Sequence, residues 1–129
     1  YLRKELEEIS KGENIFFLGE IIETEKYLKK LLCVVSTSKT EGFGLSILES
    51  MACGTPVVAL ASPGSNYLLG NLDLVVPDKS QLMDLVEKII TIPEFRANAS
   101  SRVIDKSNLF SWEKCAKANL DVYNYTLSK

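Results

Sequence analysis

Short, continuous apolar runs alternate with amphipathic stretches along this chain, and this alternation restricts the fold more than any other feature. The clearest runs are Ile15-Phe-Phe-Leu18, Cys33-Val-Val-Ser36 and Pro56-Val-Val-Ala-Leu60. Strands without polar alternation are typical of parallel sheets that are covered on both faces. The pattern therefore predicts an α/β fold, with a Rossmann-like parallel sheet flanked by helices.

Capping residues and Gly or Pro breaks set the expected limits of the other elements. Helices are expected at residues 2–9, 24 to 31 or 32, 45–53, after the N-cap Asp78, 93 to about 106, and after the N-cap Ser111. A fourth strand is expected at residues 72–76, and a loop at residues 61–66. The expected packing residues of the last helix are Trp112, Cys115, Leu120, Val122 and Tyr123.

Composition removes several classes of function. The 129 residues fit one domain, and a net charge of −2 without a basic block argues against nucleic acid as a partner. The chain has no histidine, which excludes His-based catalytic triads within it. Its three cysteines lack metal-ligand spacing, and we expect reduced, mostly buried structural thiols in a cytoplasmic protein. Neither a bilayer-spanning run nor a signal peptide is evident in the sequence.

The most chemically specific stretch is Glu41-Gly-Phe-Gly-Leu-Ser-Ile-Leu-Glu49, in which a glycine-rich turn opens a helix between two carboxylates. Gly42 and Gly44 free the backbone to adopt φ > 0 and let a ligand come close. The amides from Phe43 to Ser46 lie at the start of the helix, where unpaired N–H groups and the dipole favour an anion. A diphosphate is the natural occupant of such a site.

Each carboxylate has its own expected role. Glu49 lies about one helical turn past Leu45 and can accept hydrogen bonds from the two hydroxyls of a ribose. Glu41 stands before the turn and can accept hydrogen bonds from a second sugar. Together the two acids predict a sugar–diphosphate–ribose ligand. Two other interpretations stay open: the glycines serve only the turn beside solvated glutamates, or the two carboxylates act as in a glycosidase.

The same segment resembles the donor-binding segment of retaining glycosyltransferases of family 4, also called group 1 glycosyltransferases, which have the two-domain GT-B architecture. The segment matches the family pattern in its two Glu residues, which are spaced around Gly-Phe-Gly. It also matches in the residues that follow, Met-Ala, Gly54 and Pro56-Val-Val-Ala59. The resemblance extends to Asn14-Ile-Phe-Phe-Leu-Gly19, Leu74-Val-Val-Pro77 and Phe110-Ser-Trp112, in the family's order. Residues 1–129 are thus expected to form a single C-terminal nucleotide-sugar-binding domain.

The resemblance implies a retaining glycosyltransferase that acts in polysaccharide or glycoconjugate biosynthesis. It implies that Glu41 is catalytic and contacts the transferred sugar, and that Glu49 holds the ribose of the donor. The other implied donor-binding residues are Gly42, Phe43, Gly44 and Leu45. A nucleotide-diphosphate sugar is the implied substrate, with no cofactor and no metal. The acceptor, a sugar or a lipid-linked sugar, would bind an N-terminal domain, and peripheral membrane contact through the parent protein stays open.

The chain departs from the family pattern in two places. Gly64 fits a glycine of the family's Gly-Gly-x-x-Glu segment, but Tyr67 stands where the acid is common. Two strands whose loops carry an Arg and a Lys normally precede the part of the domain seen here, and Lys39 is the nearest cation in sequence to the anion site. The chain begins at Tyr1 and is expected to be truncated on its N-terminal side, so the isolated piece is expected to be inactive.

The absent strands would lie between the Ile15 and Cys33 strands in the usual order. We therefore expect either that the chain is part of a larger molecule or that these two strands pair directly. Two alternative functions also remain. One is a non-catalytic nucleotide-binding or interaction module with the same fold, and the weaker one is a sugar-nucleotide epimerase.

Overall fold

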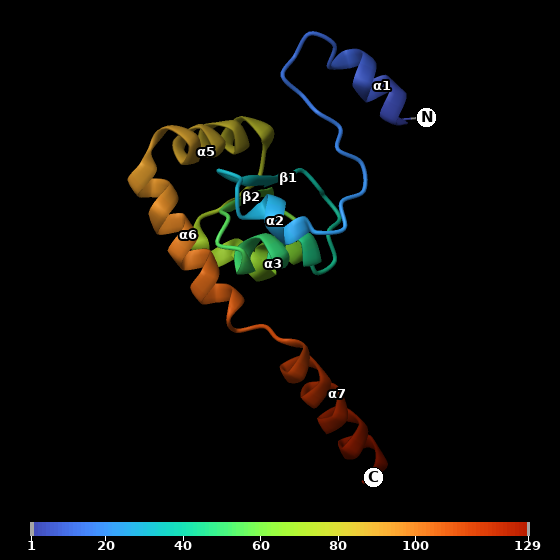
Figure 1. Cartoon of the computed structure of the whole chain (residues 1–129). Coiled ribbons are helices and arrows are strands. Elements are labelled where there is room, and N and C mark those ends of the chain that lie inside the picture. Colours follow the sequence, from blue (N-terminus) through green and yellow to red (C-terminus); the bar gives the residue numbers. More distant parts are fainter. Residues whose placement is uncertain (1, 129) are drawn as a thin grey trace.

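A three-stranded parallel sheet forms the centre of the protein, whose computed structural model describes residues 2–128. The strands are β1 (Val34–Ser36), β2 (Val57–Leu60) and β3 (Val75–Val76), in the spatial order β1-β2-β3 (Figure 1). In register, Val34 lies opposite Val57, and Ala59 lies opposite Val75. The α/β class and the parallel sheet predicted from the sequence are therefore confirmed.

Helices cover both faces of this sheet. α3 (Leu45–Ala52) and α4 (Pro63–Leu69) lie on one side, and α5 (Lys79–Thr91) lies on the other (Figure 1). α6 (Pro93–Ser107) runs from α5 to α3 along one end of the sheet. The remaining elements are α1 (Leu2–Ile9), α2 (Thr24–Leu28), the 3-10 turn η1 (Gly70–Leu72) and α7 (Trp112–Leu127).

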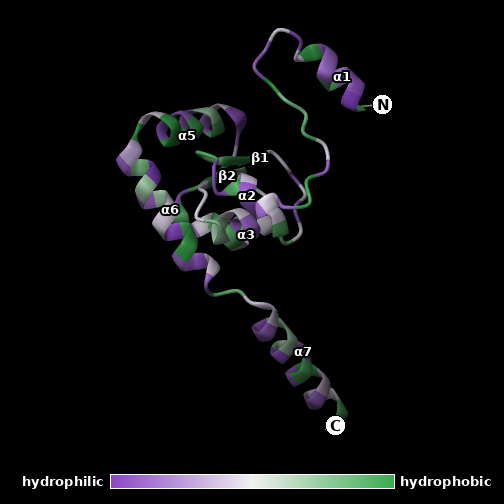
Figure 2. Ribbon diagram, viewed as in Figure 1, coloured by the Kyte–Doolittle hydropathy of each residue, from purple (hydrophilic) through white to green (hydrophobic). Residues whose placement is uncertain are grey.

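The core lies between the sheet and its covering helices. All four residues of β2 are buried, because a central parallel strand has a helical layer on each face, and this explains its continuous apolar run. Ile47 and Met51 of α3 cover one face of the sheet, while Leu82 and Ile89 of α5 cover the other. Both β1 and β2 are accordingly hydrophobic in Figure 2.

Two of the predicted caps are present. The Asp78 carboxylate accepts hydrogen bonds from the backbone amide of Gln81, at 3.0 Å, and from its side-chain amide, at 3.1 Å. The Ser111 hydroxyl accepts from the Lys114 amide at 3.2 Å and so begins α7. These local signals suffice because the cap and the amides that it satisfies are only three residues apart.

The predicted loop at residues 61–66 is wrong, because a helix begins inside it. Ser62 caps α4, and its hydroxyl accepts from the Ser65 amide at 3.2 Å, while Ser65 Oγ accepts from the Ser62 amide at 2.9 Å. Pro63 follows as the first helical residue. A serine N-cap followed by Pro at the first position is the signal that the loop prediction overlooked.

The predicted strand at Ile15–Leu18 is also wrong. No described strand pairs with this segment, and its four side chains are 55, 77, 36 and 64% exposed. An extended segment becomes a strand only when a neighbour supplies partners for its amides and carbonyls. The direct pairing with the Cys33 strand, one of the two expected arrangements, therefore does not occur.

Two further elements are shorter than predicted. The α-helix that begins at Thr24 ends at Leu28 and continues only as a turn. The strand expected from Leu72 begins at Val75, because η1 ends at Leu72 and Asp73 adopts a left-handed φ of 57°. Helix α3 ends at Ala52, one residue before its predicted end.

The last helix does not pack on the body of the domain. No residue of α7 is buried, and Trp112, Leu120 and Tyr123 are 75, 58 and 61% exposed, so the packing predicted for this helix is wrong. The expectation of mostly buried thiols is wrong as well, because Cys115 is exposed and the other two cysteines are only half-buried. α1 and α7 both extend away from the sheet in Figure 1, and both mix hydrophilic and hydrophobic positions in Figure 2. Within residues 2–128, every helix is too short or too polar to cross a bilayer.

Candidate functional site

The glycine-rich turn lies at the carboxyl end of the parallel sheet. The loop 37–44 follows β1, and Ala61 and Ser62 follow β2, so the two connections emerge at the same edge. They are joined directly, because the Gly64 amide donates to the Glu41 carbonyl at 2.9 Å. Open parallel sheets bind their ligands at this edge.

Gly44 makes the turn into α3 possible. Its φ is +94°, a left-handed value that side chains rarely adopt. A Cβ at this position would lie 3.1 Å from Ile47 Cδ1 and 3.3 Å from Glu41 Cγ. Conformation and space therefore both require glycine here.

Gly64, in the first turn of α4, packs against the backbone of the glycine-rich turn. A Cβ on this residue would lie 2.7 Å from both the carbonyl carbon and the oxygen of Phe43, and 3.0 Å from the Glu41 carbonyl oxygen. These are backbone atoms, which cannot rotate away as a flexible side chain does. The absence of a side chain at Gly64 thus lets α4 hold the loop at backbone distance.

The first turn of α3 has free amides. No side chain caps it, and the first backbone bond that closes it runs from the Leu48 amide to the Gly44 carbonyl at 3.0 Å. Among the described residues, no recorded hydrogen bond uses the amides from Phe43 to Ile47. No acidic residue lies in this first turn. These amides can therefore bind an anion.

The two predicted carboxylates occupy different settings. Glu41 is half-buried, with its side chain close to Gly44 at the start of α3. Glu49 is exposed on α3, one turn beyond Leu45, where it lines two hollows of the surface. The structure thus brings Glu41 to the turn itself and Glu49 to the hollows, while Glu41 is not among the described residues that line either hollow.

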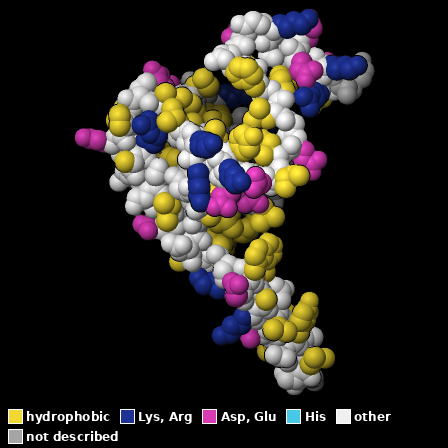
Figure 3. Space-filling model, viewed as in Figure 1, with side chains coloured by type: hydrophobic (Ala, Val, Ile, Leu, Met, Phe, Trp, Pro, Cys, Tyr) yellow, Lys and Arg dark blue, Asp and Glu magenta, His cyan; other side chains and the backbone are white. Residues whose placement is uncertain are grey.

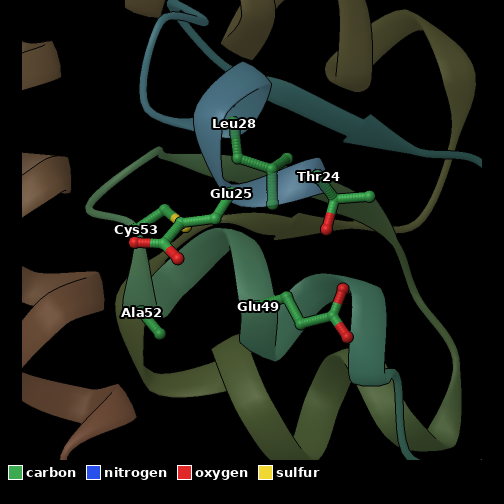
Figure 4. Close-up of a pocket in the computed structure, with 6 residues that line it drawn as sticks. All are labelled: Thr24, Glu25, Leu28, Glu49, Ala52 and Cys53. Carbon is green, nitrogen blue, oxygen red and sulfur yellow. The ribbon is translucent and has the colours of Figure 1, made fainter. Parts of the chain in front are cut away.

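The smaller hollow, of about 240 Å³, lies between α2 and α3 (Figure 4). Its lining residues are Thr24, Glu25, Leu28, Glu49, Ala52 and Cys53. α2 is held there because the Thr55 hydroxyl donates to the Leu28 carbonyl at 2.6 Å. Thr24 and Glu25 are not among the predicted site residues, because no local sequence signal indicates that α2 packs beside Glu49.

Charge within the smaller hollow is partly compensated. Glu25 pairs with Lys29 one turn along α2, and this hydrogen bond lowers the pKa of Glu25 and raises that of Lys29. Burial, followed by the charge of Glu25, raises the pKa of the Cys53 thiol. Glu49 has no recorded ion pair within residues 2–128, and its carboxylate is free to accept hydrogen bonds from hydroxyls.

The larger hollow, of about 700 Å³, separates α3 from the linker 108–111 and the first turn of α7. Most of its lining is apolar, and Figure 3 shows hydrophobic side chains between the body and α7. From α3 and its turn it is lined by Phe43, Leu45, Leu48, Glu49 and Ala52. From the other side it is lined by Ser107, Leu109, Phe110, Ser111, Trp112, Lys114 and Cys115.

Three aromatic rings meet beside the turn, and we call Phe43, Tyr67 and Phe110 the ring cluster. The Phe43 ring lies 6.0 Å from that of Tyr67 and 6.0 Å from that of Phe110, and the other two are 5.8 Å apart. Two of the contacts are edge-to-face, an arrangement that aromatic quadrupoles favour. Tyr67, which is 62% exposed, thus contacts two rings at the position where the family pattern has an acid.

Lys39, the cation considered from the sequence, is exposed in the loop before the turn. It takes part in none of the ion pairs recorded among residues 2–128. In the described part of the chain, no three His, Cys, Asp or Glu side chains converge as metal ligands would. The amides and the dipole of α3 favour an anion whether or not Lys39 contributes.

Comparison with known proteins gives one consistent result. The family described as "Glycosyl transferases group 1" matches residues 1–106. An uncharacterized glycosyltransferase of Methanocaldococcus jannaschii is 31% identical over 105 residues, which are 78% of this chain and 30% of that protein. A D-inositol 3-phosphate glycosyltransferase of Frankia alni is 31% identical over 110 residues, 82% of this chain and 27% of that protein.

A third relative is matched over nearly the whole chain. The poly(ribitol-phosphate) alpha-N-acetylglucosaminyltransferase of Staphylococcus aureus is 28% identical across 95% of this chain, and the match covers 26% of that protein. The chain thus spans between about a quarter and a third of the length of these relatives. The resemblance noted in the sequence is confirmed by these matches.

Proposed function

Because the chain belongs to the group 1 glycosyltransferases, we propose that it forms the donor-binding side of an enzyme that transfers a glycosyl group. The proposed donor is a nucleotide-diphosphate sugar, and the proposed stereochemical outcome is retention. The observation that carries the proposal is the uncapped first turn of α3, opened by Gly44 and flanked by Glu41 and Glu49.

The diphosphate would bind at the free amides of that turn. Most helix starts bury or cap these donors with their own side chains, because an unsatisfied amide costs free energy. Here Phe43 and Leu45 are exposed and Gly44 between them is buried, and among the described residues no recorded hydrogen bond uses their amides. An anion at this place gains several N–H bonds and the favourable end of the helix dipole.

The two carboxylates would hold the two sugars. Glu49 faces the smaller hollow, which is wide enough at about 240 Å³ for part of a nucleoside, and would accept from the ribose hydroxyls. Glu41, whose side chain lies close to Gly44 at the start of α3, would accept from hydroxyls of the transferred sugar. Gly42 leaves the backbone between them without a side chain, so that the sugar can approach closely.

The proposed chemistry depends on position and on stabilising the leaving group. The bond between the anomeric carbon and the diphosphate oxygen breaks while the acceptor oxygen bonds to that carbon on the same face. The acceptor proton passes to the departing phosphate oxygen. Each helix-terminus interaction with the departing charge is worth only about 1 kcal/mol. We therefore propose that cations outside the described turn complete the site in the whole protein.

The acceptor is proposed only as a class. Two relatives are named for D-inositol 3-phosphate and poly(ribitol-phosphate), both of which carry hydroxyl groups. A polyhydroxylated acceptor, free or linked to a lipid or polymer, is consistent with a transferase of this family. It would bind on a part of the protein that faces Glu41 across the donor.

Calorimetric titration with UDP, GDP and ADP tests this proposal. At least one of them should bind the whole wild-type protein, in which the proposed cations are present, and Glu49→Gln should weaken that binding roughly tenfold, since it removes a charged acceptor. Glu87→Gln is the matched control, because Glu87 is an exposed glutamate on α5, beyond the opposite face of the sheet. Unchanged affinity in Glu49→Gln would assign the ribose to other residues, and no binding by the wild type would refute the proposal.

A second candidate is a nucleotide-binding module without catalysis. It is favoured by Tyr67, whose ring packs in the ring cluster where the family pattern has an acid. The two candidates differ in turnover, because only an enzyme releases sugar from the bound donor. Donor hydrolysis by the whole protein, followed over hours with and without Glu41→Gln, distinguishes them.

A further inference from the structure

The donor loop, residues 41–45, is held at few points. The Glu41 carbonyl accepts from Gly64, and the Gly44 carbonyl accepts from Leu48. Between these two bonds, the residue with a recorded side-chain contact to another element is Phe43, through the ring cluster. Gly64 and Leu68 of α4 also lie against the backbone of Phe43 and Gly44. The Phe43 ring therefore adds a side-chain support to the backbone contacts that α4 supplies.

One of the two rings that hold Phe43 comes from the linker between α6 and α7. Phe110 lies in that linker and meets Phe43 edge to face, with an interplanar angle of 73°. It is half-buried, whereas the neighbouring Leu109 is 59% exposed. The linker thus inserts a single ring into the structure beside the donor loop.

The linker itself is held in a defined conformation. The Phe110 amide donates to the Ser107 carbonyl at 3.0 Å, which fixes the ring relative to the end of α6. Lys114 Nζ donates to the carbonyls of Asn108 and Leu109 at 3.0 and 3.1 Å, which ties the first turn of α7 back to the same linker. A change in the direction of α7 therefore acts on the segment that carries Phe110.

We propose that Phe110 is a positioning residue for the donor loop and that it links diphosphate binding to the setting of α7. This rests on the proposed function of the loop as a diphosphate site. Phe110 acts through Phe43: with the ring in place, the amides of the first turn of α3 are already arranged for an anion. Pre-arrangement raises affinity because less order has to be imposed on binding.

The chain contains its own reporter of this link. Trp112 is the single tryptophan, lies two residues beyond Phe110, and lines the larger hollow together with Leu45 and Glu49. It is 75% exposed, so its emission responds to changes in its surroundings. Inorganic pyrophosphate, which does not absorb where tryptophan does, is a suitable probe for the loop.

The experiment titrates the whole protein with pyrophosphate by tryptophan fluorescence and with UDP, GDP and ADP by calorimetry. A Trp112→Phe variant gives the signal of any other tryptophan, which is subtracted. The wild type should show a saturable change in Trp112 emission. Phe110→Ala should weaken binding roughly tenfold, as expected for the loss of aromatic contacts, and should lose the emission change at saturation. Phe110→Tyr, which keeps the ring, should restore both. Leu109→Ala is the matched control in the same linker and should behave as the wild type.

Three results would overturn the proposal. If Phe110→Ala binds as tightly as the wild type and keeps the emission change, Phe110 does not position the loop. If Leu109→Ala fails in the same way, the linker as a whole matters and the ring does not. If the wild type binds none of the probes, the proposed function fails first and this proposal fails with it. Phe110→Leu keeps apolar volume without a ring and replaces Phe110→Ala if that variant does not fold.

Discussion

The two helices that begin at the carboxyl end of the sheet, α3 and α4, start in opposite ways. α4 begins with Ser62 and Ser65, each of which satisfies the backbone amide of the other, and both are buried. α3 begins with Gly44 in a left-handed conformation and has no side-chain cap. The two helix starts therefore have different roles at the same end of the sheet. The capped start of α4 stabilises the fold, whereas the uncapped start of α3 leaves backbone amides that can donate hydrogen bonds to a ligand.

The first turn of α4 also contacts the loop that leads into α3. The Gly64 amide, in the first turn of α4, binds the Glu41 carbonyl at 2.9 Å, and the bare Cα of Gly64 faces the backbone of Phe43. α4 therefore supports the donor loop without occupying its amides. Four substitutions test this division of roles, in order of their expected effect on stability.

Gly64→Ala should have the largest effect, because its Cβ would lie 2.7 Å from the Phe43 carbonyl carbon and oxygen. Backbone atoms at that distance have to shift, so we expect a loss of about 3 kcal/mol in the free energy of unfolding. Nucleoside diphosphate binding should fall as well, because the loop moves with Phe43. Urea unfolding together with calorimetry measures both. Gly70→Ala is the control, since a Cβ there meets nothing within 4 Å.

Gly44→Ala should have the second largest effect. We expect a loss of about 1–2 kcal/mol in the free energy of unfolding, because an L side chain is strained at φ +94°. Its Cβ would also press on Ile47 Cδ1 at 3.1 Å. Diphosphate affinity should fall together with stability, because this residue aims the free amides. A variant with full stability and full affinity would mean that the left-handed turn is not needed.

Ser62→Ala should lower the free energy of unfolding by about 1 kcal/mol, the usual value for a lost N-cap. The hydroxyl accepts from the Ser65 amide at 3.2 Å and is 2.9 Å from Ser65 Oγ, so its removal leaves α4 partly uncapped. Diphosphate affinity should change much less than stability, because the amides of α3 are untouched. Thermal unfolding and calorimetry, compared with Ser62→Thr as the capping control, decide this.

Ser46→Asp should have the smallest effect on stability but a large effect on diphosphate binding. A carboxylate in the first turn of α3 interacts favourably with the dipole and should add about 0.5 kcal/mol. The same charge repels a diphosphate, so binding should be lost while the protein becomes slightly more stable. Ser46→Asn, without the charge, should keep binding. Tight diphosphate binding by Ser46→Asp would place the anion elsewhere.

The same local physics explains which elements the sequence predicted correctly. The cap residue Asp78 and the amide of Gln81 are three positions apart, so their bond is visible in the sequence before any tertiary contact is known. The all-apolar run of β2 likewise reports burial on both faces. Ser62-Pro63 carried the same kind of signal for α4, and the loop predicted at residues 61–66 resulted from overlooking it.

Other features depended on partners distant in sequence. Ile15–Leu18 has the composition of a strand, but no described strand lies beside it, and its recorded hydrogen bond comes from the Arg3 side chain to the Phe17 carbonyl. Helix α7 has apolar positions that suggest packing, yet none of its residues is buried. An apolar pattern indicates which face of a segment can be buried. Whether that face is buried depends on whether another part of the structure packs against it.

For this protein the sequence by itself determined the parallel α/β fold, the turn at Gly44 and the spacing of Glu41 and Glu49, because each depends on periodicity or on residues within one or two helical turns. Only the tertiary structure decided that Gly64 supports the donor loop, that Thr24 and Glu25 share a hollow with Glu49, and that Phe43, Tyr67 and Phe110 form one cluster. Those contacts join segments far apart along the chain, and their geometry is set by how the helices pack on the sheet.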